Sequence, residues 1–137
     1  EKQIAIRLNN HTEHSIVHAD KTKIEQVIYN LLDNAIKFTP NGKSIYVTLS
    51  EKHDKIFVSV KDEGCGIPKE SLNRVWVRFY KADRSRGKDK QGTGLGLAIT
   101  KEIIKAHNEN INVVSTEGVG SEFTFSLSKA TTDSEQS

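Results

Sequence analysis

The stretch that decides the fold is DKTKIEQVIYNLLDNAIKFTPNG, residues 20–42. Asp20 can accept hydrogen bonds from the first N–H groups of a helix, and Pro40 with the following Gly42 can end one. Between these signals, apolar residues recur at intervals of three and four: Ile24, Val27, Ile28, Leu31, Leu32, Ala35 and Ile36. This spacing predicts one long amphipathic helix with a broad apolar face.

Short segments around this helix alternate apolar and polar residues, which is typical of strands with one buried face. They are residues 4–8, 45–49, 56–60, 111–115 and 122–127, and the polar link 51–55 predicts a hairpin. Residues 69–75 and 95–107 have helical patterns. We therefore predict a two-layer α/β sandwich, with a mixed five-stranded sheet and three helices on one face.

Composition limits the kinds of function this chain can have. Its 137 residues suit one domain, which we place at residues 1–129, followed by a polar, disordered tail at 130–137. The formal net charge of +2 predicts no nucleic-acid partner, and a single cysteine excludes an internal disulfide. No long apolar stretch, leader peptide or methionine is present. We expect a cytosolic fragment of a larger protein that does not itself contact a membrane.

One polar stripe on the long helix could carry chemistry. Asn30, Asn34 and Lys37 are four and three residues apart, so they share one side of the helix, away from its apolar centre. Amide oxygens suit Mg²⁺, which also takes substrate phosphates as ligands, and a lysine ammonium suits phosphate. The alternative is an ordinary solvated helix face.

Two glycine-rich segments follow. Residues 62–68 read DEGCGIP after an apolar strand, where Asp62 could accept a hydrogen bond from an exocyclic amine such as that of adenine. The glycines would let the backbone approach a flat ring, although a strand-ending turn is the simpler interpretation. Residues 92–97 read GTGLGL and open a helix, where free N–H groups favour phosphate. They match neither a Walker A loop nor a Rossmann turn.

Taken together, these motifs resemble those of the Bergerat-fold ATPase and kinase superfamily, and within it the sensor histidine kinases. Four segments carry the resemblance to the family's N, G1, F and G2 boxes: residues 30–40, 62–68, 78–83 and 92–99. The third, Arg-Phe-Tyr-Lys-Ala-Asp, further resembles the respiratory-response sensor kinases of Gram-positive bacteria.

The resemblance implies ATP and Mg²⁺ as cofactors. It implies that Asn34 coordinates Mg²⁺, that Asn30 assists at metal and phosphates, and that Lys37 contacts phosphate. Asp62 is implied to accept the adenine amine. The other implied nucleotide-binding residues are Phe38, Gly64, Gly66, Ile67, Gly92, Thr93, Gly94, Leu95, Gly96 and Leu97. Residues 77–94 are implied to form a lid. The basic residues in or beside it are candidates to neutralise the γ-phosphate or else are solvated loop charges: Arg78, Lys81, Arg84 and Arg86.

Position 30 separates subclasses of this superfamily. ATP-hydrolysing relatives carry Glu there to activate water, whereas an Asn amide takes up no proton near neutral pH. Asn30 therefore fits transfer to a histidine imidazole, which is itself the nucleophile. The chain's five histidines lack the acceptor pattern His-Glu-x-x-Thr-Pro: His11, His14, His18, His53 and His107. His107, which ends the second long helix, is interpreted as structural.

The parent protein implied by this resemblance is a membrane-anchored bacterial sensor kinase. Its dimerisation and phosphoacceptor domain, absent from this chain, would receive the phosphate and pass it to a response regulator. We expect the chain alone to bind ATP without autophosphorylating. Two rivals share the fold: an anti-sigma-factor serine kinase and a non-enzymatic ATP-gated module. Cys65, inside the G1 box, is either a small gap-filling residue or a redox-sensitive thiol.

Overall fold

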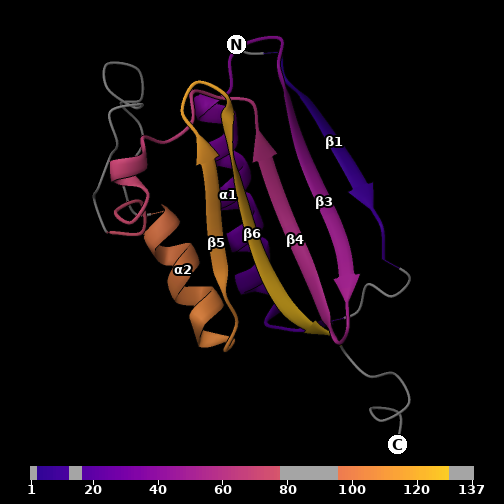
Figure 1. The fold of residues 1–137 in the computed structure, drawn as a ribbon. Coiled ribbons are helices and arrows are strands. Elements are labelled where there is room, and N and C mark those ends of the chain that lie inside the picture. Colours follow the sequence, from indigo (N-terminus) through magenta and orange to yellow (C-terminus); the bar gives the residue numbers. More distant parts are fainter. Residues whose placement is uncertain (1–2, 13–16, 78–95, 130–137) are drawn as a thin grey trace, which may run out of the picture.

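The computed structural model describes residues 3–12, 17–77 and 96–129 (Figure 1). Helices α1 (Lys21–Phe38) and α2 (Gly96–Ala106) cover one face of the sheet, and η1 (Lys69–Ser71) is a 3-10 helix. The strands are β1 (Ala5–Asn10), β2 (Val17–His18), β3 (Ser44–Lys52), β4 (Lys55–Asp62), β5 (Ile111–Thr116) and β6 (Gly120–Lys129). Among these described residues, no helix has the length and apolarity needed to span a bilayer.

The sheet is mixed, as predicted. Its strand order is β1-β3-β4-β6-β2, with β5 also paired to β6, and only the β1–β3 pair is parallel. All five predicted strands are present, and the two-layer α/β sandwich is confirmed. The two-residue β2 adds a pairing that is too short to produce an alternating pattern.

The prediction of three helices needs correction. Residues 69–75 contain one 3-10 turn instead of an α-helix, because Pro68 at its start supplies no side-chain cap and the segment is too short to propagate. The described residues thus hold two α-helices and one 3-10 helix.

The core lies between α1 and the centre of the sheet. Asp20 caps α1 as predicted, because its side chain accepts a hydrogen bond from the Lys23 N–H at 3.1 Å. Val27, Leu31 and Ala35 are at most 1% exposed and pack in one cluster with buried β-strand residues, among them Ile45, Val60, Phe123 and Phe125. Burying one such side chain contributes about 1.5–3 kcal/mol, so this face fixes α1 on the sheet.

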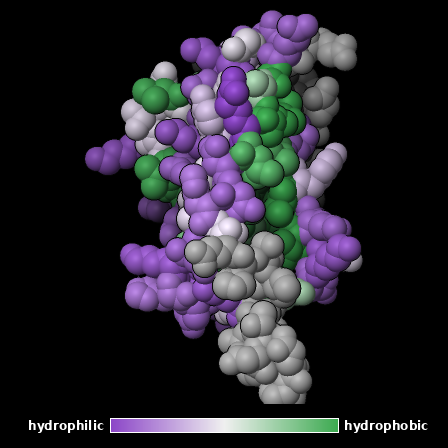
Figure 2. Space-filling model, turned by 90° about the vertical axis from the view of Figure 1, so that its right-hand side faces the viewer, coloured by the Kyte–Doolittle hydropathy of each residue, from purple (hydrophilic) through white to green (hydrophobic). Residues whose placement is uncertain are grey.

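Strand β1 differs from its predicted half-buried form. It is the terminal strand beside β3, and all six of its residues are exposed. Ile6 and Leu8 are 52% and 67% exposed because α1 packs on β4 and does not extend over this edge. Figure 2 views the molecule from this side and shows a band of apolar surface there.

The C-terminal end of α2 is tied to the start of α1. Asn108 has a φ of 60°, the left-handed exit that Asn tolerates, and the Glu109 N–H donates to the Ile104 carbonyl. His107 accepts a hydrogen bond at Nε2 from the Asp20 N–H at 3.0 Å, and its Nδ1 lies 2.8 Å from the Ile103 oxygen. These contacts fit the structural interpretation of His107.

A buried carboxylate fixes the same end of the molecule. Glu109 is 7% exposed, and its carboxylate accepts hydrogen bonds from Lys55 at 2.6 and 2.8 Å and from Ser126 and Ser128 at 2.8 Å each. Burial alone would raise the pKa of Glu109, but the hydrogen bonds from Lys55, Ser128 and Ser126 and the charge of Lys55 lower this pKa below its usual value. This network joins β4, β6 and the loop after α2.

Candidate functional site

The predicted stripe on α1 contacts the start of α2 through its first residue, Asn30. Asn30, Asn34 and Lys37 are all partly buried. The Asn30 amide nitrogen Nδ2 lies 3.5 Å from the Gly96 carbonyl oxygen and 3.4 Å from Thr100 Oγ1. At the other end of the stripe, Lys37 Nζ lies 3.2 Å from the Asp33 carboxylate. The stripe therefore contacts α2 at Asn30, whereas Lys37 lies close to the C-terminal end of α1.

Asp62 ends strand β4 as a buried carboxylate, 1% exposed. Its Oδ1 accepts hydrogen bonds from the Gly64 N–H at 2.9 Å and from the Ser121 N–H at 3.3 Å. Ser121 is the register partner of Asp62 on β6, so the sheet itself places this donor. These two bonds fix the orientation of the Asp62 carboxyl group at the end of the strand.

Glycines pack the G1 segment against other parts of the backbone. A Cβ added to Gly64 would come within 3 Å of the Phe38 carbonyl oxygen, at the end of α1. A Cβ on Gly66, whose φ is +75°, would similarly meet the Thr116 oxygen in the β5–β6 turn. In the structure these two glycines allow other parts of the backbone to approach closely, whereas the motif predicted close approach to a flat ring. They hold Asp62 between α1 and the β5–β6 turn.

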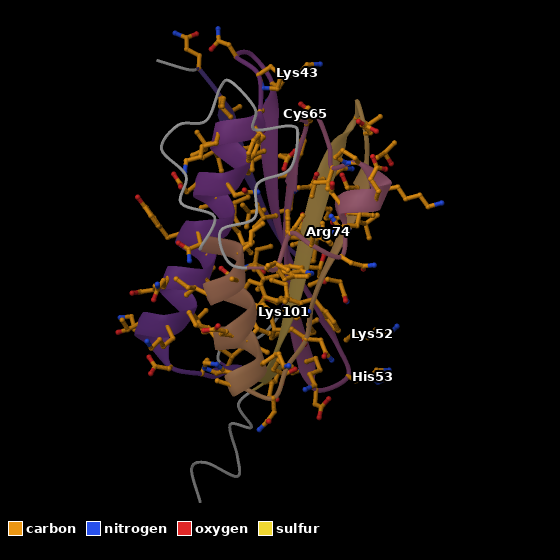
Figure 3. All side chains as sticks on the ribbon, turned by 90° about the vertical axis from the view of Figure 1, so that its left-hand side faces the viewer. Lys43, Lys52, His53, Cys65, Arg74 and Lys101 are labelled. Carbon is orange, nitrogen blue, oxygen red and sulfur yellow. The ribbon has the colours of Figure 1, made fainter. Side chains whose placement is uncertain are left out.

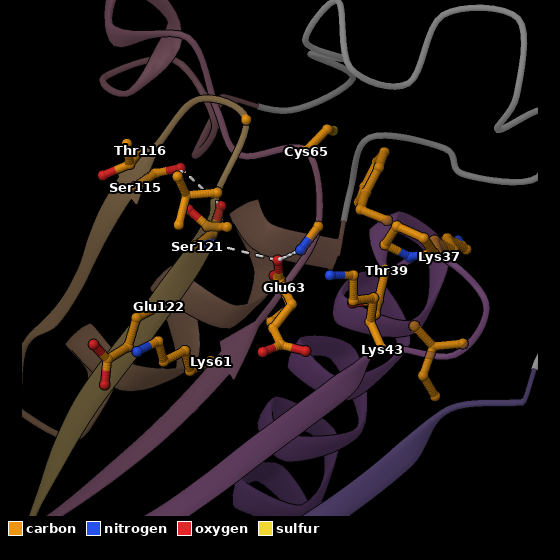
Figure 4. Close-up of a pocket in the computed structure, with 18 of the residues that line it drawn as sticks. Lys37, Thr39, Lys43, Lys61, Glu63, Cys65, Ser115, Thr116, Ser121 and Glu122 are labelled. Carbon is orange, nitrogen blue, oxygen red and sulfur yellow. Dashed lines mark hydrogen bonds between the residues drawn. The ribbon is translucent and has the colours of Figure 1, made fainter.

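Figure 4 shows an open cavity at this end of the sheet. Five predicted site residues line it: Lys37, Phe38, Asp62, Gly64 and Cys65. Further lining residues include Ile36, Thr39, Lys43, Lys61, Glu63, Val119 and Ser121. The exposed Cys65 thiol and Lys43 lie at this end of the domain, and Lys52 and His53 lie at the opposite end (Figure 3).

Other predicted residues lie outside that lining. Asn30 contacts α2 and Asn34 is partly buried one turn further along α1, whereas Gly96 and Leu97 begin α2. Ile67 is 1% exposed, and its N–H donates to Ser115 Oγ at 2.7 Å. The predicted residues Arg78, Lys81, Gly92, Thr93, Gly94 and Leu95, with the proposed lid from residue 78 onward, lie outside the described residues.

Three hydroxyl residues near the site were not predicted from sequence. Ser121 supplies a backbone donor to Asp62, Ser115 holds Ile67, and Thr100 contacts Asn30. Serine and threonine are common in any strand or helix, so only the pairing of distant segments reveals these contacts.

The donor set fits a magnesium–nucleotide ligand. Asn30 and Asn34 offer neutral amide oxygens on one side of α1, and a nucleotide's phosphates would supply the negative charge that such a metal site otherwise lacks. A partly buried lysine and a buried, oriented carboxylate lie at the same end of the domain. A cationic group can therefore meet phosphate while an anionic acceptor meets a base.

Comparison with known proteins gives a consistent match. Residues 19–131 match the family model described as "Histidine kinase-, DNA gyrase B-, and HSP90-like ATPase". The sensor histidine kinase WalK of Bacillus subtilis is 43% identical over 113 residues, which cover 81% of this chain and 18% of WalK. The sensor protein SrrB of Staphylococcus aureus is 41% identical over 120 residues, which cover 88% of this chain and 21% of SrrB. The chain therefore spans about a fifth of these relatives' length.

Solved structures agree in fold. The nucleotide-free catalytic domain of histidine kinase ThkA has a TM-score of 0.78 and 34% identity, with 92% of this chain and 79% of that one covered. Full-length ShkA in complex with AMPPNP has a TM-score of 0.78 and 28% identity, with 93% of this chain and 26% of ShkA covered.

Proposed function

This chain belongs to the histidine kinase-, DNA gyrase B- and HSP90-like ATPase family as the catalytic domain of a sensor histidine kinase, and on that premise we propose that it binds Mg-ATP and donates the γ-phosphate to a histidine on another domain. The observation that carries the proposal is the buried, oriented Asp62 carboxylate, which lines the same cavity as Lys37. Residues 1–129 are the proposed domain.

At the base end, Asp62 would accept the exocyclic amine of adenine. Desolvation makes this contact selective, because a buried carboxylate that meets another acceptor instead of a donor loses about 1–3 kcal/mol or more. The Gly64 and Ser121 N–H groups hold Oδ1, so little conformational entropy remains to be lost when the base binds. Phe38, Gly64, Gly66 and Ile67 are the proposed walls around the base.

At the phosphate end, Asn34 is the proposed Mg²⁺ ligand and Asn30 its neighbour at metal and phosphates. The metal, when bound, would neutralise charge on the phosphates. Lys37 is paired with Asp33 four residues earlier, and an i,i+4 pair on a helix is worth only about 0.3–0.5 kcal/mol. Lys37 can therefore exchange Asp33 for a phosphate at small cost. Gly92, Thr93, Gly94, Leu95, Gly96 and Leu97 are proposed to admit the phosphates, with Arg78 and Lys81 as candidate γ-phosphate contacts.

The residue at position 30 favours transfer over hydrolysis. A hydrolase needs a base to take a proton from water, and the Asn30 amide cannot serve as one. Its Nδ2 is also directed at α2, towards Gly96 and Thr100. The reaction that remains is attack by a nucleophile that needs no such base, such as a neutral imidazole.

The parent protein is proposed to be membrane-anchored, with this domain in the cytoplasm. Its own dimerisation domain would supply the acceptor histidine and would contact the response regulator. We also propose that the parent is a sensor kinase of the respiratory-response type, on the basis of the sequence of residues 78–83. The similarity to SrrB is consistent with this proposal.

A trans-phosphorylation experiment tests the proposed function. The chain is incubated with γ-labelled ATP, alone and with the dimerisation domain of its parent or of WalK. We expect label only on the added domain, in an acid-labile form typical of phosphohistidine. Acid-stable label would indicate a serine kinase, and nucleotide binding without any transfer would indicate an ATP-gated module. Label on the chain alone would contradict the expected absence of an acceptor.

A further inference from the structure

Thr100 is a fully buried polar residue on α2, at 0% exposure. It lies one helical turn after Gly96, the first residue of that helix. A buried hydroxyl needs a hydrogen-bond partner, and Thr100 Oγ1 lies 3.4 Å from the Asn30 amide nitrogen on α1. This contact joins positions 70 residues apart in the sequence.

The contact fixes which way the Asn30 amide points. A backbone carbonyl can only accept a hydrogen bond, so the Gly96 oxygen, 3.5 Å away, selects the amide's NH₂ group. Thr100 Oγ1 offers a second acceptor on the same side. Both distances are long for N–H···O bonds, so the pair of acceptors, more than either bond alone, defines the orientation. The amide oxygen Oδ1 is then the atom not turned towards α2.

That orientation matters because Mg²⁺ takes oxygen ligands and its bound waters donate hydrogen bonds, whereas an amide NH₂ can only donate. We propose that Thr100 is a positioning residue, which together with the Gly96 carbonyl holds the Asn30 amide so that Oδ1 is presented to the Mg²⁺ ion of the nucleotide and its bound waters. This inference rests on the proposed function, because it assumes that the ligand is Mg-ATP. The contact itself is a feature of the ligand-free domain.

The test compares Thr100→Val, which keeps the shape but deletes the hydroxyl, with Thr100→Ser, which keeps the hydroxyl. The measured quantity is the ratio of ATP dissociation constants in EDTA and in Mg²⁺. We expect this ratio to fall about fivefold in Thr100→Val, the equivalent of one hydrogen bond, and to stay near wild type in Thr100→Ser. The ATP affinity in EDTA should be the same in all three proteins, because the base contacts do not involve Thr100.

An Asn30→Ala background shows whether Thr100 acts through Asn30. There, Thr100→Val should produce no additional fall in the ratio. An unchanged ratio in the single Thr100→Val variant would overturn the proposal, and so would a fall that persists in the Asn30→Ala background. Thermal unfolding shows whether each variant is folded. If valine is poorly accommodated at this position, Thr100→Ala removes the same hydroxyl.

A ligand-free measurement separates this inference from the proposed function. The side-chain NH₂ protons of Asn30 should exchange with solvent more slowly in wild type than in Thr100→Val, as measured by NMR. Equal exchange rates would refute the positioning role even if the domain binds ATP tightly. Conversely, slow exchange in a domain that binds no nucleotide would refute the proposed function and support the contact between Thr100 and Asn30.

Discussion

Glu109 and Lys55 offer a test of how this fold is held together at the end remote from the site. Strand β4 runs from Lys55 to Asp62, about 23 Å at about 3.3 Å per residue. Glu109→Gln removes the charge but keeps a group that the neighbouring serines can bond. Lys55→Met leaves a 7%-exposed carboxylate with hydroxyl donors alone.

The expected costs follow from these contacts. Breaking a buried pair by removing one partner costs about 3–5 kcal/mol. The Lys55 side chain is 36% exposed, so water can replace part of its interaction, and we expect Lys55→Met to cost about 2–3 kcal/mol. Glu109→Gln should cost about 1–2 kcal/mol, because Lys55 can turn to solvent. Lys52→Met, at an exposed lysine of the same hairpin, is the control and should stay within about 0.5 kcal/mol.

The pH dependence gives a sharper readout. Because the folded-state pKa of Glu109 is lowered from 4.5, its contribution is present at neutral pH and is lost as pH falls through that lowered pKa. The stability gap between wild type and Glu109→Gln, measured by urea unfolding, should therefore shrink as the pH is lowered from 7 to 3. A gap that is constant over this range, or a Lys55→Met variant more stable than wild type at pH 7, would refute the reasoning. Nucleotide affinity should be unchanged in both variants.

Two further predictions concern the G1 segment. Gly66→Ala should cost about 3 kcal/mol in thermal or urea unfolding, because its φ is +75° and the new Cβ would meet a backbone carbonyl; Gly42→Ala, with φ +90° but open space, should cost only about 1–2 kcal/mol, and equal costs would show that the contact is unimportant. Alkylation or oxidation of the exposed Cys65 should weaken ATP binding, and ATP should slow the alkylation. A Cys65→Ser variant that loses affinity under oxidant as wild type does would place the sensitivity elsewhere.

The sequence predicted most of the fold because its patterns are local. The apolar spacing of α1, its Asp20 cap and the alternating strands each depend on residues close together in the chain. Edge effects were not predictable in this way: Ile6 and Leu8 alternate like core residues, yet α1 does not extend over β1. Burial depends on which elements pack against each other, and the sequence of a single strand does not indicate this.

The same difference between local patterns and long-range contacts applies to the candidate site. The motifs proposed Asp62 and Lys37 as site residues, and in the structure both line a common cavity. The motifs did not reveal that Gly64 and Gly66 admit backbone from α1 and the β5–β6 turn, or that Thr100 contacts Asn30. Those contacts join segments that are distant in the sequence and are visible only after the chain has folded.

The most direct test of the proposed function is calorimetric ATP binding by wild type, Asp62→Asn and Asn34→Ala, each with and without Mg²⁺. We expect Asp62→Asn to lose about tenfold or more in affinity under both conditions, because a charge-assisted hydrogen bond to adenine is worth about 1.5–3 kcal/mol. Asn34→Ala should bind normally in EDTA but gain little from Mg²⁺. Wild-type affinity in Asp62→Asn, or an undiminished Mg²⁺ effect in Asn34→Ala, would contradict the account.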